Sequence, residues 1–327
     1  MGKLKNLKFW VFAIICAVII APTINRDATI AAESPLVGTG IAKFLRIGLG
    51  SRAAGMGGAY VGVSDNVDAI FWNPAGLSQL TNREFGLTYM QWFEDIMCGV
   101  IAYGHPLPKG MGAIGINLLY WNMGTIEKTT DGTNYTSASV TQGAGGISYS
   151  IAMMRNLLLF GATIKGIYQD LAGNYMNGIA GDAGILFRLS KDINLGLSLQ
   201  NIGPVYKQDG SIEILPDNIK AGVAFRPGGK GFMIAVDVDK PSDNDPKFHA
   251  GAEYYFEKFA LRVGYNQAEA TSAKDASAFS GFTAGLGFKG GVGEESTEAK
   301  LKVEADYAYI PYGTLGTTHR LTVILKF

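Results

Sequence analysis

The sequence predicts an all-β fold: a transmembrane antiparallel β-barrel of about 14 strands, with an N-terminal hatch or plug segment in its lumen. Three observations carry this prediction. The chain ends on an alternating strand, in which Leu321, Val323 and Leu325 share one face and Phe327 is the last residue. The strand-like segments are even in number. Glycine accounts for 44 of 327 residues and charged residues for only 17%, with a formal net charge of zero.

The strand-like segments are recognised by the alternation of apolar with polar or small residues, which is the period of a half-buried strand. This alternation fits a membrane barrel, and it also fits a soluble sandwich with one wet face per sheet. Most segments run about 8–12 residues, whereas strands of soluble sheets average about 5–6, so their length favours the barrel. The predicted strands are 84–90, 97–105, 111–121, 138–152, 157–168, 178–189, 193–200, 218–226, 231–239, 247–256, 259–266, 279–288, 300–309 and 318–327.

The connections between these strands alternate in length, as they do in outer-membrane barrels. They are short after even-numbered strands, at 190–192, 227–230 and 257–258, and long after odd-numbered strands, at 122–137, 169–177, 201–217 and 267–278. The pattern places both ends of the barrel domain, residues 84–327, at the periplasmic rim. The connection 289–299 departs from it, because it is long on the short-turn side.

The N-terminus has the pattern of a secretory signal peptide, assigned to residues 1–32. Three lysines precede an apolar run over 9–21, which is shorter than the roughly 20 residues of a membrane-spanning helix. Cleavage is favoured near 29–32, and a retained signal anchor is the alternative. Together with the barrel, the signal peptide predicts location in the cell outer membrane, in contact with outer-membrane lipid.

Residues 33–83 differ from the wall-forming segments, because small residues dominate the stretch 48–60. A backbone with few bulky side chains can pass close to other backbone, which fits a plug inside the lumen. A type I turn is predicted at 73–76, with asparagine, proline and glycine in their preferred positions. The residues assigned to the hatch are Gly48, Gly50, Arg52, Gly55, Gly57, Gly58, Asp65, Asp68, Asn73, Pro74, Ala75 and Gly76.

Four motifs in this segment carry a family resemblance: FLRIG at 44–48, SRAAGMGGA at 51–59, DNVDA at 65–69 and WNPAGL at 72–77. They resemble the PorV/PorQ-type branch of the FadL-like outer-membrane β-barrel proteins. The resemblance implies a barrel of about 14 strands whose hatch, with its Asn-Pro-Ala motif, blocks the lumen. It implies passage of long-chain fatty acids and other hydrophobic small molecules through a hatch-gated barrel. The alternative, from the PorV branch, is a structural or carrier component of a type IX-like protein secretion system, with secretion-system proteins as partners.

Charged side chains on the polar faces of the late strands are predicted to face the lumen. Charges of both signs there could anchor the plug through ion pairs or line a polar path, and anchoring is favoured. Phe327 is predicted to be the assembly signal that the barrel assembly machinery reads. The predicted lumen-facing residues are Arg262, Lys300, Lys302, Glu304, Asp306, Arg320 and Lys326.

Other functions find little support in the sequence. The zero net charge gives no electrostatic case for nucleic acid. His105, His249 and His319 are scattered, without the spacing of a metal site or a catalytic base. The G-x-G-x-x-G match at 285–290 runs from a strand into a loop and does not open a helix. We therefore expect no cofactor, no bound metal and no enzymatic activity.

Overall fold

The computed structural model describes residues 41–93, 96–129, 133, 135–229, 231–267, 281–292, 301–313 and 316–327. The predicted signal peptide, 1–32, and the first residues of the predicted hatch lie outside the described residues. Within the described ranges, no helix has both the length and the apolar character needed to cross a membrane.

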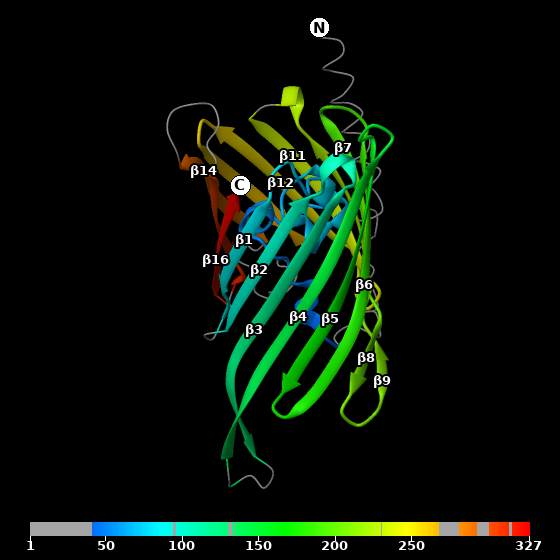
Figure 1. Ribbon diagram of the computed structural model, residues 1–327. Coiled ribbons are helices and arrows are strands. Elements are labelled where there is room, and N and C mark those ends of the chain that lie inside the picture. The colour runs from blue at the N-terminus through cyan, green and yellow to red at the C-terminus, as the bar shows by residue number, and fades with distance from the viewer. Residues whose placement is uncertain are drawn as a thin grey trace, which may run out of the picture.

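Sixteen strands form one antiparallel sheet that closes into a barrel (Figure 1). Two of them, β8 and β9, form a hairpin that pairs with the first part of β6, so 14 strands make the wall, as predicted. The wall closes where β1 pairs with β16, and backbone hydrogen bonds between Arg83 and Phe327 continue this pairing. The strands are β1 (Glu84–Gln91), β2 (Met97–Pro106), β3 (Ala113–Thr129), β4 (Tyr135–Met153), β5 (Leu158–Leu171), β6 (Asn174–Arg188), β7 (Ile193–Ile202), β8 (Pro204–Lys207), β9 (Ile212–Ile214), β10 (Asn218–Phe225), β11 (Phe232–Pro241), β12 (Lys247–Phe256), β13 (Phe259–Asn266), β14 (Phe282–Val292), β15 (Leu301–Pro311) and β16 (Thr317–Lys326).

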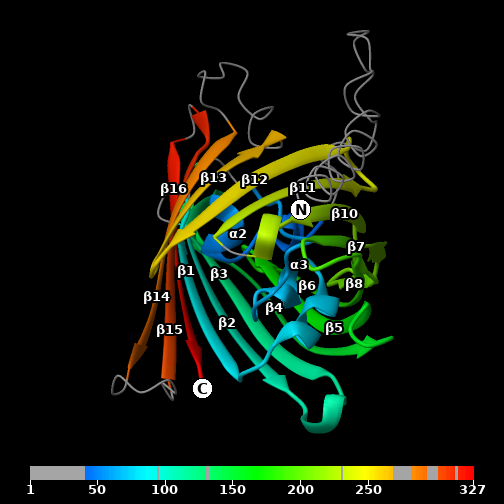
Figure 2. The same ribbon diagram turned by 90° about the horizontal axis from the view of Figure 1, so that it is seen from above.

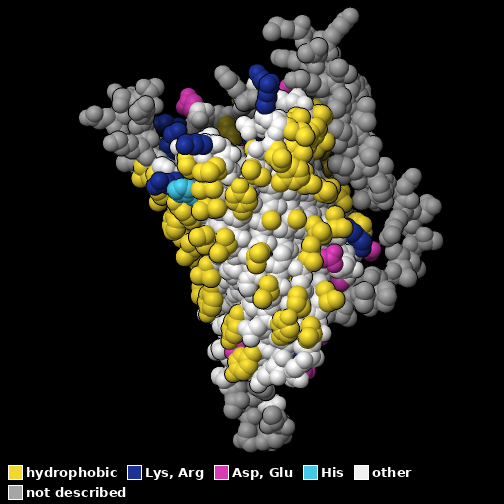
Figure 3. Space-filling view, turned by 45° about the vertical axis from the view of Figure 1, so that its right-hand side comes forward, with side chains coloured by type: hydrophobic (Ala, Val, Ile, Leu, Met, Phe, Trp, Pro, Cys, Tyr) yellow, Lys and Arg dark blue, Asp and Glu magenta, His cyan; other side chains and the backbone are white. Residues whose placement is uncertain are grey.

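The late strands direct their side chains as the alternation predicts. In β16, Arg320 is buried while its neighbour Leu321 is 48% exposed, and in β13 Arg262 is buried while Leu261 is 50% exposed. Because successive side chains of a strand point to opposite faces, one face of each strand is apolar and the other is polar. Figure 3 shows hydrophobic side chains spread over the outer wall, with Lys and Arg side chains gathered at its upper rim.

Residues 41–83, here called the lumenal segment, run inside the barrel. Figure 2 shows α2 and α3 enclosed by the ring of strands. Every residue from 49 to 64 is buried, α2 packs against β13 to β16, and η2 packs against β4, β5 and β6. The short helices of this segment are η1 (Lys43–Arg46), α2 (Ser51–Gly55), α3 (Ala69–Trp72) and η2 (Pro74–Gln79), and further turns of 3₁₀-helix, η3 (Pro108–Gly110) and η4 (Pro227–Gly229), follow β2 and β10.

The loops predicted at 122–137 and 169–177 are wrong, because both stretches are mostly strand. β3 continues past a register shift between Asn122 and Thr125, and β5 and β6 are separated by two residues. The β3 extension exposes Thr125, Glu127 and Thr129, so it lacks the apolar face that marks a membrane strand in the sequence. The predicted loop 201–217 contains β8 and β9. Figure 1 shows the β5–β6 and β8–β9 hairpins at the end of the barrel away from the C-terminus.

Candidate functional site

A buried ion-pair network centred on Arg52 joins the lumenal segment to the wall. The Arg52 guanidinium, on α2, donates two hydrogen bonds of 2.7 Å to the two carboxylate oxygens of Glu253 on β12. Arg262 of β13 donates to the same Glu253 at 2.7 Å and to Asp306 of β15 at 2.7 Å. A bidentate arginine–carboxylate pair restricts the relative orientation of the two groups as well as their distance. The network therefore holds α2 at one position against three strands.

Asp65 makes a second charged connection between the lumenal segment and the wall. Its carboxylate accepts from Arg52 at 2.5 Å and from Arg226, which follows β10, at 2.8 Å. Burial alone raises the pKa of the Asp65 carboxyl, but the attraction of Arg52 and Arg226 outweighs burial and holds this pKa well below its usual range. Asp65 is consequently charged throughout the neutral pH range.

Asp68, at the start of α3, differs from Asp65 in its surroundings. It is 3% exposed, and its Oδ2 atom has no hydrogen-bond partner among the described residues. Burial, together with the nearby carboxylates of Asp306 and Glu84, raises the pKa of Asp68 from 3.8 to about 7. Asp68 therefore changes charge close to neutral pH, inside the lumen.

Charged side chains also bridge the seam at which the barrel closes. Lys326 of β16 lies 2.9 Å from the Glu84 carboxylate of β1 and 3.1 Å from that of Glu304 on β15. Glu84 in turn accepts a hydrogen bond of 2.8 Å from the backbone N–H of Val67. Two predicted lumen-facing residues, Lys326 and Glu304, are thus brought together at the seam, and the lumenal segment contacts it through Val67.

The Asn73 side chain fastens the predicted turn to the wall. Its Oδ1 accepts from the N–H of Ala75 at 3.2 Å, and its Nδ2 donates to the carbonyls of Val61 at 3.2 Å and of Ile185, on β6, at 3.0 Å. The N–H of Gly76 bonds the Asn73 carbonyl at 2.9 Å, which is the bond expected of a β-turn. The turn then continues as η2, with Pro74 in its first turn.

Inward-facing glycines of the wall are close-contact positions that the sequence analysis did not single out. A Cβ added to Gly161 of β5 would lie 2.2 Å from the carbonyl carbon of Pro74, and one added to Gly264 of β13 would lie 2.1 Å from the backbone nitrogen of Gly57. Only a residue without a side chain permits this approach of backbone to backbone. The available signal was glycine on the polar face of an alternating strand.

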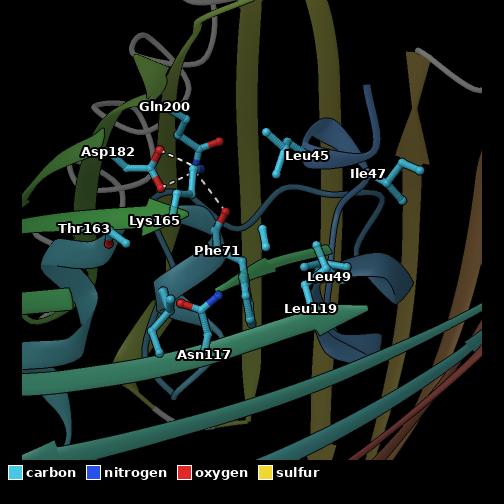
Figure 4. A pocket seen from close by; sticks show the side chains of 12 residues that line it. Leu45, Ile47, Leu49, Phe71, Asn117, Leu119, Thr163, Lys165, Asp182 and Gln200 are labelled. Atoms are coloured by element: carbon cyan, nitrogen blue, oxygen red, sulfur yellow. Dashed lines mark hydrogen bonds and ion pairs between the residues drawn. The ribbon is translucent and has the colours of Figure 1, made fainter. Parts of the chain in front are cut away.

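Cavities of about 40, 240 and 460 Å³ lie between the lumenal segment and the wall. Ile47, which follows η1, lines all of them. Figure 4 shows the smallest, where Lys165 is paired with Asp182 at 2.8 and 2.9 Å and the side chain of Leu49 lies on the opposite side. Ile47 is therefore a neighbour shared by all three spaces.

The cavity of about 460 Å³ is predominantly apolar. Its volume lies in the range of sites for small organic ligands, which are typically about 300–1,000 Å³. It is lined by Ile41, Ala42, Phe44 and Ile47 of the lumenal segment, by Trp92, Ile96, Trp121, Met123, Leu171 and Met176 of the wall and its connections, and by the polar residues Lys43, Gln142 and Gln169. The space suits an apolar molecule of small size.

The remaining residues predicted for the hatch, the lumen and the C-terminus differ in their surroundings. Gly50 and Gly57 have positive φ of 85° and 67°, a conformation that favours glycine, and Gly48, Gly55, Gly58 and Gly76 each have a neighbouring atom within 3.2 Å of where a Cβ would lie. Arg320 is buried in the lumen, Lys302 is exposed, and Lys300 lies outside the described residues. Phe327 is 50% exposed. The roles assigned to these residues stay predictions.

Comparison with known proteins identifies the fold. The toluene transporter TbuX of Ralstonia pickettii has a similar structure, with a TM-score of 0.52 and 14% identity over 85% of this chain and 97% of that one. The toluene transporter TodX of Pseudomonas putida gives a TM-score of 0.56 at 14% identity, over 85% and 97% of the two chains. A FadL homologue of Pseudomonas aeruginosa gives 0.52 at 10% identity, again over 85% and 97%.

These neighbours are FadL-type channels, and the likeness shows that this chain has their barrel fold. No family model matches the sequence. No curated protein matches it either. The resemblance to the PorV/PorQ-type branch stays a prediction.

Proposed function

We propose that this barrel mediates the passage of hydrophobic small molecules across the outer membrane, with residues 33–83 acting as a hatch that gates the lumen. The apolar cavity of about 460 Å³ beside the lumenal segment is the observation that supports this most directly. The proposal includes removal of residues 1–32 as a signal peptide, insertion by the barrel assembly machinery and contact with outer-membrane lipid. Toluene is a suitable probe, because proteins of the same fold are toluene transporters.

Ile47 is the side chain on which passage depends in this proposal, since it lines all of the lumenal cavities described above. In this proposal, a smaller residue at this position opens a path between the apolar cavity and the neighbouring lumenal cavities. A larger residue fills it. The substitutions Ile47→Ala and Ile47→Trp therefore act in opposite directions on a lumenal route.

The test is uptake of radiolabelled toluene by cells whose outer membrane has an outer leaflet of lipopolysaccharide. This leaflet slows the entry of apolar solutes when no channel is present. We expect Ile47→Ala to raise the uptake rate and Ile47→Trp to lower it. Ile101→Ala is the matched control, because Ile101 is 44% exposed on the outer face of β2, and it should behave as wild type. Equal uptake by all variants, or by cells with and without the protein, would contradict the proposal.

The β8–β9 hairpin supports a second candidate, a PorV-like carrier role in protein secretion. Ile212 and Ile214 of this hairpin are 62% and 82% exposed, and Tyr206 is 49% exposed. Apolar side chains clustered at an exposed hairpin are typical of a protein-binding surface. If the hairpin binds a secretion partner, Ile214→Asp should reduce export of cargo by the native host and leave toluene uptake unchanged. Unaltered export would count against this candidate.

A further inference from the structure

The second lumenal cavity, of about 240 Å³, differs from the apolar one in its chemistry. It lies between the lumenal segment and the wall formed by β10 to β16. Among the residues that the structure describes, its lining includes five basic and three aromatic side chains, and Asp239 is the acidic member. The basic members are Lys43, Arg46, Lys220, His249 and Arg320, and the aromatic members are Trp72, Trp92 and Tyr312.

Some of these charges are balanced within the protein. Arg46 is paired with Asp243, with a second contact at 3.1 Å. His249 places Nε2 at 2.5 Å from the Asp239 carboxylate and Nδ1 at 2.9 Å from the carbonyl oxygen of Gly57. Both of these partners are acceptors, so both ring nitrogens donate and the imidazole is positively charged. Asp239 is therefore neutralised by His249 and supplies no net negative charge to the cavity.

Lys220 and Arg320 make no direct ion pair of this kind, although the buried carboxylates of Asp237 and Asp239 attract Lys220 from a longer distance. In the described part of the chain, no carboxylate lies within ion-pair distance of either cation. Lys220 is 8% exposed, and its ammonium lies 4.8 Å from the centre of the Trp72 ring. Arg320 is 5% exposed and donates to the carbonyl of Gly48 and, at 3.3 Å, to the Tyr312 hydroxyl. Its Nε–H is buried and has no acceptor among the described residues.

Buried cations without a direct ion-pair partner are unfavourable, because their desolvation is only partly offset by more distant charges. Two such cations on the wall of one cavity therefore form a site prepared for an anion. The lining also restricts the body of the ligand. Trp72 and Trp92 lie beside the two cations, with the Arg320 guanidinium 5.6 Å from the centre of the Trp92 ring, so a flat aromatic group bound to the cations meets the two indole rings at their edges. The volume of about 240 Å³ is below that of sites for drug-sized ligands, which indicates a compact molecule.

We infer that this cavity binds a small aromatic carboxylate, with its carboxylate at Lys220 and Arg320 and its ring against Trp72 and Trp92. This inference rests on the proposed function and names a substrate class for the lumen beyond neutral hydrocarbons. The Nε–H of Arg320 and the ammonium of Lys220 donate charge-assisted hydrogen bonds to the carboxylate oxygens. No bond is made or broken, so the site is one of binding and passage.

The test measures binding of sodium benzoate to the purified full-length protein in detergent by isothermal titration calorimetry. We expect saturable binding that Lys220→Met weakens roughly ten- to a hundredfold, as expected for loss of one hydrogen bond to a charged group. Lys220→Arg should retain most of the affinity, because it keeps the charge. Lys302→Met is the control, since Lys302 is exposed and does not line the cavity, and it should bind as wild type.

A ligand series on the unaltered protein tests the inference without any variant. Benzoate should bind more tightly than toluene, which lacks the charge, and more tightly than inorganic phosphate, which lacks the ring. Octanoate binding more tightly than benzoate would overturn the inference in favour of an extended chain that passes Ile47. Equal binding of toluene, equal binding of phosphate, or absence of benzoate binding would also overturn it. Toluene uptake that persists when benzoate does not bind would leave the proposed function intact.

Discussion

Replacement of Arg52 by methionine tests the anchoring of the lumenal segment most directly. Arg52 is 4% exposed and pairs with Glu253 on the wall and with Asp65 in its own segment. Methionine preserves much of the side-chain volume but removes the charge and every donor. The variant therefore breaks the link between α2 and β12 without adding a bulky group to the lumen.

The magnitude follows from the partners that remain. Breaking a buried ion pair by removing one member costs about 3–5 kcal/mol. Glu253 retains Arg262, and Asp65 retains Arg226, so neither carboxylate is left without a cation. The lower end of the range, about 3 kcal/mol, is therefore expected. Since about 1.4 kcal/mol corresponds to a factor of ten, the undocked fraction of the segment should rise roughly a hundredfold.

The assay is single-channel conductance in planar bilayers, with heat-modifiable migration on gels as the measure of an intact barrel. We expect Arg52→Met to migrate as a folded barrel and to open more often, or to a larger conductance, than wild type. Arg83→Met is the matched control, because Arg83 belongs to the same segment but is exposed. A folded Arg52→Met protein with the wild-type conductance would refute the reasoning, since it would show that the network does not hold a gate.

Three further predictions concern single residues. The pKa of the Asp68 carboxyl is 3.8 in water and about 7 in the docked segment, so docking takes up a proton between these two pH values. Docking is most stable below a pH of about 3.8. It weakens as pH rises through about 7, and the total loss is up to about 4 kcal/mol. Conductance should therefore increase from about pH 5.5 to about pH 8 in wild type, and a pH-dependent increase that persists in Asp68→Asn would contradict this assignment. Gly161→Val should prevent η2 from packing on β5 and should raise conductance. Gly99→Val is the control, because Gly99 occupies an open outward position of β2, and it should leave conductance unchanged. Equal conductances of the two variants would disprove the close-contact argument. Phe327→Ala should lower the yield of inserted protein more than Leu261→Ala, measured by membrane fractionation, and equal yields would show that the terminus is merely a strand end.

Much of the wall could be predicted because strand faces are a local property. Side chains of a strand alternate with period two, so Arg320 and Leu321 are assigned to opposite faces from the sequence alone. The predicted strand count is confirmed. The same rule failed where the wall leaves its apolar band: the extension of β3 to Thr129 has no apolar face, so its sequence is read as a loop although its backbone pairs with β4.

The sequence by itself determined which face of each apolar strand lies outward and which faces the lumen, and that the residues around Gly48 to Ala59 are small enough for a confined path. Only the tertiary structure decided how these groups meet. Arg52 and Glu253 lie 201 positions apart in sequence, and their contact depends on the closure of the barrel and on the depth at which α2 enters it. The same holds for Lys220 and Arg320, which line one cavity from distant strands. Local periodicity carries no information on such distances, because the register and closure of all the strands set them together.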